Sequence, residues 1–277
     1  PAPKGINYRM HPENRHVLKA ARLDACILAN NHVLDWNRKG LHDTLSALEA
    51  EGIAHVGAGH NAEEAARALV LSPPDGRARL IVLAYAERGS GVSPDWTATP
   101  ERGGVNPLPA TVEATVSEVS RRIDSAGKPG DMVLVSLHWG GNWGFEIPDW
   151  QRSLAHALIE RAGVDVVFGH SAHHPKSVEI HRGRLILYGA GDLINDYEGI
   201  AGHDAYHPDL GLGWFVDLAP DGAFAALEAV VLRRRRFRLE HAPAPEADWL
   251  ARRLGMDAAD GCVLRLSARP ASTRRSP

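Results

Sequence analysis

Three short apolar runs in this sequence each end in side chains that can bind a metal or move a proton. The runs are ILANNH at 27–32, VLVSLHWG at 133–140 and VVFGHSAHH at 166–174. A buried strand that ends at an imidazole or an amide presents that group at one edge of a sheet. Because the ends of neighbouring strands meet at such an edge, we expect the three runs to bring their donors together around one cation.

The last run carries the strongest signal of the three. His170, His173 and His174 come directly after VVFG, and neutral imidazole is the commonest protein donor to transition metals. His138 ends the middle run, and the glycine and tryptophan residues of 139–144 that follow it could let a ligand approach the backbone and wall a pocket. The alternative for each histidine is a structural one, as a turn cap or as a core side chain packed on tryptophan.

The first run pairs an amide with an imidazole. Asn31 can ligate a divalent metal through its side-chain oxygen, while His32 can reach outward as a proton donor. A turn-forming asparagine beside a surface histidine is the alternative, and the pair gains weight only from the two other runs. Asn142 and Glu146, just past His138, are candidates for contacting substrate, and Glu146 could position a cationic or amide group.

Several weaker features have an ordinary structural explanation. An acidic segment after YGAG, at 192–198, could line the site or form a plain turn. His203 and His207 lie between Gly202 and Pro208, which favours a surface loop. The arginines of 233–238 fit a solvated rim of an edge strand, although they could also contact an anionic polymer.

The elements that must position these residues are those of an α/β protein. Unalternating apolar runs bounded by Gly or Pro, separated by amphipathic stretches, indicate strands buried between layers. After residue 164 strand follows strand, with HRGR at 181–184 as a hairpin turn, so the sheet should be mixed. The segment 88–109 is rich in Gly and Pro and is predicted to be a long loop. We expect strands near 24–29, 53–57, 78–85, 131–138, 164–168, 176–181, 184–189, 212–218 and 224–232, and helices near 12–22, 39–51, 61–70, 110–126, 149–162 and 245–254.

Composition excludes several classes of protein. With 277 residues, of which 44% are hydrophobic and 23% charged, the chain can bury one large core. The formal net charge of −3 argues against a nucleic-acid partner. Two cysteines make a disulfide framework improbable, and no apolar stretch of about 20 residues offers a membrane span. The chain by itself favours a cytoplasmic location, although an upstream signal or anchor could place the protein at the cell envelope.

In combination, the motifs resemble the CapA family (capsule and poly-γ-glutamate biosynthesis) within the calcineurin-like metallophosphatase superfamily. The resemblance covers about residues 3–240 and implies a metallophosphatase-like αββα sandwich of two mixed β-sheets flanked by helices, with two metals at the sheet edge. The segments that carry it are ILANNHVLDW, GLHDTLSALEAEGI followed by VGAG, SLHWGGNWGFEIP, GVDVVFGHSAHHPKSVEI and GRLILYGAGDLINDY.

The resemblance also implies roles for single residues. Asn31, His138 and His170 resemble the ligands of the second metal, His173 resembles an imidazole ligand of the first, and His32 resembles the histidine that protonates the leaving group. The superfamily spaces its last two histidines two residues apart, whereas CapA-like chains space them three apart, so His174 is a rival for His173.

One departure from the family pattern is large. The Gly-Asp and Asn-Leu-Glu motifs that supply acidic ligands do not occur before GINYRMHPEN at 5–14, so the chain looks N-terminally truncated and should lack its first strand or strands. Without those motifs only His173 would hold the first metal, while Asn31, His138 and His170 would still face the second. A neutral site of three ligands should bind a dication more weakly than one with a bridging carboxylate. We therefore expect at most one tightly held ion of Mn, Fe or Zn at this site, where the full-length parent would hold two. Residues 1–267 are predicted to form one domain, and 268–277 a disordered tail.

Two functions of different classes follow. The first is hydrolysis of a small phosphoester, or a related bond, in which metals lower the pKa of a bound water and His32 protonates the departing oxygen. The second is an accessory role in capsule assembly or export, in which the fold binds an anionic polyamide and contacts the capsule-synthesis machinery. A chain without catalytic activity is a third possibility.

Overall fold

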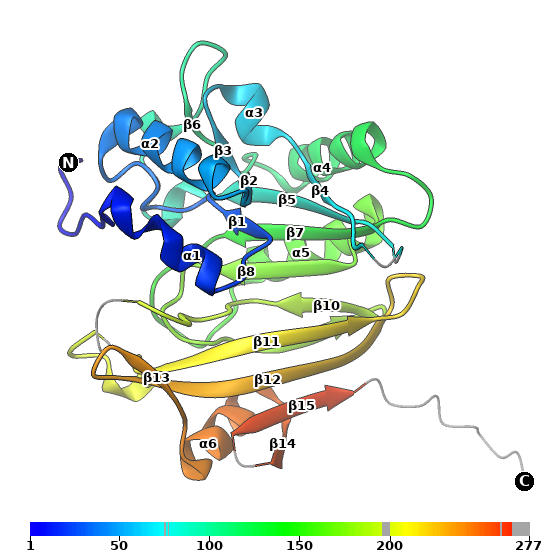
Figure 1. The fold of residues 1–277 in the computed structure, drawn as a ribbon. Helices are drawn as coiled ribbons and strands as arrows, with labels where there is room; N and C mark the ends of the chain where they lie inside the picture. The colour runs from blue at the N-terminus through cyan, green and yellow to red at the C-terminus, as the bar shows by residue number, and fades with distance from the viewer. Residues whose placement is uncertain (75, 77, 196–199, 261, 268–277) are drawn as a thin grey trace, which may run out of the picture.

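The computed structural model describes residues 1–74, 76, 78–195, 200–260 and 262–267, and its centre is a six-stranded mixed sheet (Figure 1). The strands run in the order β4-β5-β7-β8-β10-β9. The four inner strands are parallel, and both edge strands pair antiparallel with their neighbours. Their bounds are β4 Leu69–Leu71, β5 Leu80–Ala86, β7 Met132–His138, β8 Val166–His170, β9 Val178–His181 and β10 Arg184–Leu187.

The inner strands read as continuous apolar runs because both faces of this sheet are covered. Helices α4 (Val112–Ala126) and α5 (Asp149–Ala162) pack on one face, where their apolar sides meet residues such as Leu83 and Val135. Thr111 caps α4 by accepting a hydrogen bond from the backbone N–H of Ala114.

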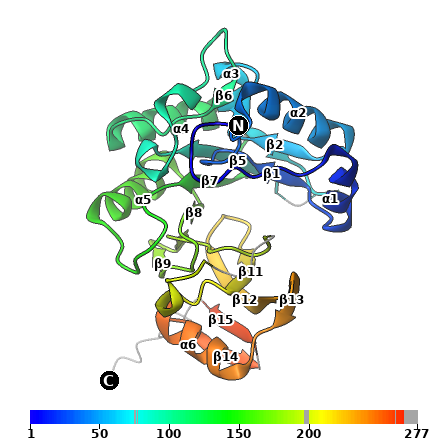
Figure 2. The same cartoon turned by 90° about the vertical axis from the view of Figure 1, so that its left-hand side faces the viewer.

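The other face packs against a second sheet and helix α6 (Ala244–Leu254). Leu185 and Leu187 of β10 share a core with residues of the second sheet, such as Leu212 and Val231. That sheet comprises β11 (Leu210–Leu218), β12 (Phe224–Arg235), β13 (Arg238–His241), β14 (Asp257–Asp260) and β15 (Val263–Ser267). Figures 1 and 2 show β14, β15 and α6 at the end of the molecule away from α2. The predicted α/β fold of two sheets with flanking helices is confirmed, although every pairing described in the second sheet is antiparallel rather than mixed.

A third core lies around helix α2 (Asn37–Ala50). It packs on a small parallel sheet of β1 (Ala25–Ile27) and β2 (Ala54–Val56) and on the β5 side chains that face away from α4. Strand β1 therefore ends close to β5, which is how the Asn31–His32 segment reaches the edge where β7 and β8 end. Shorter elements of this part are a 3-10 helix at Pro12–His16, α1 (Val17–Ala20), β3 (Ala58–Gly59), α3 (Ala62–Ala66) and β6 (Gly104–Val105).

The prediction of a helix at 61–70 is wrong in its second half. Helix α3 ends at Ala66, and Leu69–Leu71 form β4, which pairs with β5 at the sheet edge. As a strand, Leu69–Leu71 form backbone hydrogen bonds with the edge of β5. A longer helix would leave the backbone groups at this edge of β5 without these partners. The predicted hairpin turn is confirmed, with Arg182 at φ 49° and Gly183 at φ 76°, as a two-residue turn of the I′ type requires.

Parts of the sequence predictions fall outside the described residues. These are the tail at 268–277 together with Asp196 and Glu198 of the acidic segment. Within the part of the chain that the structure describes, no helix is both long and apolar enough to cross a bilayer.

Candidate metal and proton-transfer site at the sheet edge

The imidazoles of His138 and His170 meet at the carboxyl edge of the six-stranded sheet. Strands β7 and β8 are parallel neighbours, and these two residues are register partners at the ends of their strands. Their Nδ1 atoms lie 3.1 Å apart. The convergence predicted from the sequence for this pair is therefore present in the structure.

The hydrogen bonds of the outer nitrogens decide where the protons sit. The Nε2 of His138 lies 3.3 Å from the carbonyl oxygen of Ser90, which can only accept, so this nitrogen carries the proton and Nδ1 carries a lone pair. The Nε2 of His170 lies 3.0 Å from the Ser136 hydroxyl, which can donate or accept. If Ser136 donates, His170 Nδ1–H bonds to His138. If it accepts, two lone pairs face each other, and a cation relieves their repulsion.

Burial keeps both imidazoles neutral. It lowers the pKa of His138 to about 4, although the hydrogen bond to the Ser90 carbonyl opposes this effect, and lowers the pKa of His170 to about 3. Charges on His32, His173 and Lys4 lower the pKa of His138 further. Neutral imidazole is the form that binds a metal, so the donor set fits a divalent cation.

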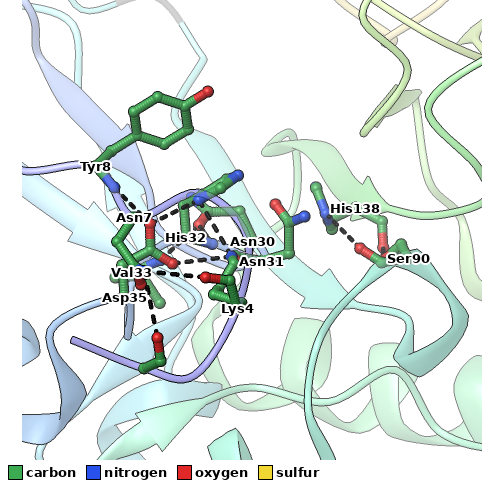
Figure 3. Close-up of polar contacts among 11 residues, drawn as sticks. Lys4, Asn7, Tyr8, Asn30, Asn31, His32, Val33, Asp35, Ser90 and His138 are labelled. Carbon is green, nitrogen blue, oxygen red and sulfur yellow. Dashed lines mark hydrogen bonds and ion pairs between the residues drawn. The ribbon is translucent and has the colours of Figure 1, made fainter.

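His32 is oriented by a buried carboxylate. Its Nδ1 lies 2.7 Å from Asp35 Oδ2, and Asp35, which is 1% exposed, also accepts from Lys4 Nζ at 2.9 Å and from the backbone N–H of Tyr8 at 2.7 Å (Figure 3). This arrangement fixes the ring and leaves Nε2 directed away from Asp35. Burial lowers the pKa of His32, and Lys4 adds to that effect, while Asp35 opposes it.

Asn31 lies between His32 and His138, as Figure 3 shows. Its backbone carbonyl accepts a hydrogen bond from Lys4 Nζ at 2.6 Å. On the other side, a Cβ atom on Gly91 would come within 3.0 Å of the Asn31 amide nitrogen. Because Gly91 has φ 81° and no side chain, the loop after β5 can close over this amide, and the loop at 88–109 forms one wall of the site.

His173 lies in the turn after β8. Its Nδ1 lies 3.0 Å from Asp192 Oδ2, and its backbone N–H donates to the carbonyl of Asn142. A carboxylate on one ring nitrogen is a common arrangement around metal-binding histidines. Ser171, at φ 113°, forms the turn and donates its hydroxyl proton to the Gly140 carbonyl, so the loops after β7 and β8 are joined.

His174 points elsewhere. It is fully buried, its Nδ1 lies 3.0 Å from the Pro175 carbonyl, and its ring packs edge-on against Phe145 and in a stack with Tyr206. The charge on His173 contributes to the lowered pKa of both His32 and His138. The geometry therefore favours His173 over His174 as the member of the site.

The structure does not close a compact ligand set around the predicted residues. Among described residues, His138, His170 and His173 do not form a group of three whose donor atoms all lie within 4.8 Å of one another. The side chains of Asn142 and Glu146 are exposed. The two tryptophans of 139–144, which could have formed the walls of one pocket, lie in different surroundings. Trp139 is buried in the core, whereas Trp143 stacks on His203 with ring centroids 3.9 Å apart.

Comparison with known proteins decides the family. The model of a family described as bacterial capsule synthesis protein PGA_cap matches residues 1–197, which is more than half of the chain. This chain belongs to the PGA_cap family. The resemblance to CapA proteins inferred from the motifs is confirmed by this match.

Two relatives of known name support the assignment to the PGA_cap family. A probable polyglutamine synthesis accessory protein of Mycobacterium tuberculosis is 41% identical over 249 residues, which are 89% of this chain and 65% of that protein. The PGA biosynthesis protein CapA of Bacillus subtilis is 30% identical over 196 residues, 70% of this chain and 48% of that protein. The chain thus spans less than two thirds of the length of these relatives.

A solved structure of a novel phosphatase from Mycoplasma pneumoniae is also similar. It aligns over 82% of this chain and 73% of its own, with 11% sequence identity and a TM-score of 0.42. A likeness at this level is too weak to support an inference about activity.

Sequence reasoning missed three residues of this candidate site: Asp35, Lys4 and Ser90. Asp35 lies three residues after His32, and this short spacing could have indicated that the carboxylate contacts the imidazole. Lys4 and Ser90 are 28 and 48 residues from the histidines they contact, so nothing local in the sequence indicates either contact.

The prediction that the arginines of 233–238 form a solvated rim is wrong for Arg234. It is 4% exposed, and its guanidinium donates to backbone carbonyls of Asp192, Leu193, Pro208 and Leu210. It therefore holds the segment that carries Asp192, the partner of His173.

Replacing Arg234 with methionine should lower the free energy of unfolding by about 2–3 kcal/mol, because buried carbonyls lose their donors. Denaturant unfolding measures this. Arg235→Met, at an exposed position of the same strand, is the matched control and should change stability by no more than about 0.5 kcal/mol. Equal effects of the two substitutions would contradict the structural role.

Proposed function

We propose that this chain is a CapA-like protein of capsule or poly-γ-glutamate synthesis that uses a divalent metal at the sheet edge to hydrolyse a phosphoester or a related bond. The observation that supports it most is the pair of neutral imidazoles, His138 buried and His170 half-buried, whose Nδ1 atoms face each other at 3.1 Å. A structural histidine pair needs only a hydrogen bond, but a pair at the end of two parallel strands, beside an oriented third histidine, has the composition of a catalytic site.

Four residues would hold the metal: Asn31, His138, His170 and His173. When bound, a Mn, Fe or Zn ion supplies a Lewis acid that polarises the substrate and lowers the pKa of a water. Ser136 and Asp192 would orient His170 and His173 through their second ring nitrogens.

His32 would donate a proton to the oxygen of the leaving group. Asp35 accepts from Nδ1 and fixes the tautomer, so Nε2 is the nitrogen available to a substrate. Since burial lowers the pKa of His32, the ring is neutral at neutral pH and must first take up a proton before it donates one. Lys4, held against Asp35 and His32, adds a positive charge that would attract an anionic substrate.

A turnover assay tests this proposal. The chelator-treated protein is supplied with Mn²⁺, Fe²⁺ or Zn²⁺ and given aryl phosphate monoesters and diesters. We expect metal-dependent release, and a loss of at least about 100-fold in His32→Ala with the metal retained. His241→Ala, at an exposed position in β13, is the control. Absence of turnover with every metal, or an unchanged rate in His32→Ala, would rule the hydrolase out.

A binding role is the second candidate, and one surface feature favours it. Arg235, Arg236 and Arg238 are all exposed around the turn between β12 and β13, and clustered cations attract a polyanion. The name of the Mycobacterium tuberculosis relative also describes an accessory protein. Retention of poly-γ-glutamate on the chelated protein, lost when these three arginines become alanine, would support this role. Retention that is equal in the two proteins would exclude the arginines from it.

A further inference from the structure

A second cluster of imidazoles and carboxylates lies between α5 and the edge strand β9. His156 and Glu160 are one helical turn apart on α5, so their side chains leave the helix on the same side. Glu179 and His181 are two residues apart on β9, so they project from the same face of the strand. Two elements thus present four side chains of metal-binding type to each other.

The donor atoms of this cluster are close together. His156 Nε2 lies 2.7 Å from Glu179 Oε1, and His181 Nε2 lies 2.7 Å from Glu160 Oε1. The two imidazole rings stack with centroids 3.7 Å apart and an interplanar angle of 6°. Within the described part of the chain, His156, Glu179 and His181 are the one group of three His, Cys, Asp or Glu residues whose ligand atoms all lie within 4.8 Å of one another.

The chemistry of the donors suits a transition metal. Two imidazoles and a carboxylate form a common ligand set for zinc, and Glu160 accepts a hydrogen bond from His181 Nε2, as outer partners of metal-binding histidines do. Each of the four side chains keeps between 20% and 30% of its surface exposed, which leaves a path for an ion to enter.

Glu179 is already oriented for such a role. Its Oε2 accepts hydrogen bonds from the Tyr188 hydroxyl at 2.8 Å and from Arg152 at 2.7 Å, while Oε1 faces the imidazoles. Tyr188 is 2% exposed and cannot turn away, so it acts as an outer support of the kind that holds metal ligands. Arg152 pairs with Glu179, and Arg182 pairs with Glu160 at 3.0 Å. Their side chains are 45% and 68% exposed, so both can move into solvent when an ion binds.

This cluster is separate from the sheet-edge site. His181 pairs with Arg184 at the amino end of β10, whereas His138 and His170 lie at the carboxyl ends of the parallel strands. The cluster therefore sits toward the opposite end of the sheet, and an ion here would not contact the residues of the proposed hydrolase.

We propose that His156, Glu179 and His181 form a site for a transition-metal ion such as Zn²⁺ or Co²⁺, with Glu160 as the outer partner that orients the His181 ring. The ion would tie the edge strand β9 to helix α5. Because such an ion binds only the folded chain, the melting temperature should rise with metal concentration.

A cobalt titration tests the site, since four-coordinate Co²⁺ absorbs visible light far more strongly than the hydrated ion. The full chain is treated with chelator and compared with two matched double variants, His156→Ala/His181→Ala and His138→Ala/His170→Ala. We expect the His138/His170 variant to keep the strong cobalt absorption and to lose it on addition of Zn²⁺. In the His156/His181 variant the affinity should fall at least about 100-fold.

Glu179→Gln provides a conservative check, because an amide keeps the shape and can still accept from Tyr188. It should weaken cobalt binding by about 10–100-fold with an unchanged circular dichroism spectrum. If the His156/His181 variant does not fold, this substitution alone decides the question. Cobalt affinity that is unchanged in Glu179→Gln, or strong absorption that disappears in the His138/His170 variant, would overturn the proposal.

Discussion

Replacing His170 with alanine is expected to remove the divalent ion from the sheet edge and to abolish metal-dependent turnover. His170 supplies one of two nitrogens that face each other at 3.1 Å. The loss of a ligand should weaken binding by at least about 100-fold, since the loss of an outer support alone costs 10–100-fold. Elemental analysis after dialysis, together with the turnover assay, measures both effects.

Two further variants make this test specific. The measurement is made in the His156→Ala/His181→Ala background, so that an ion in the second cluster does not contribute to the count. Ser136→Ala keeps both imidazoles but removes the hydroxyl next to His170 Nε2, and it should reduce affinity by about 10-fold. If His170→Ala retains one equivalent of metal and the parental rate, the sheet edge is not a metal site.

Replacing Asp35 with alanine should lower the free energy of unfolding by about 3 kcal/mol. The carboxylate is 1% exposed and accepts hydrogen bonds from Lys4, His32 and the Tyr8 backbone. Its removal leaves a partly buried ammonium without its counter-charge, which costs about 3–5 kcal/mol in a closed interior. The lower end applies because the Lys4 side chain is 25% exposed and water can reach it.

An exposed ion pair elsewhere in the chain provides the control. Lys39 and Asp43 lie four residues apart on α2, and their side chains are 85% and 62% exposed. Asp43→Ala should therefore change stability by less than about 1 kcal/mol. Urea unfolding of both variants gives the comparison, and an Asp35→Ala protein as stable as Asp43→Ala would show that the buried network is not structural.

The sequence by itself determined the elements and the strand ends. The inner strands are continuous apolar runs and the helices α4 and α5 are amphipathic, so their periods could be recognised within about ten residues of chain. Because parallel strands end at the same edge, His138 and His170 could be expected to meet there from their positions alone, and they do.

Only the tertiary structure decided which side chains act as partners. Asp35 and Lys4 orient His32, Arg234 is buried against the segment of Asp192, and Leu69–Leu71 join the sheet instead of extending a helix. Likewise His156 and His181 look like isolated surface histidines until α5 and β9 are packed together. Each of these results depends on contacts between segments that are distant in sequence, and local patterns of polarity carry no information about such contacts.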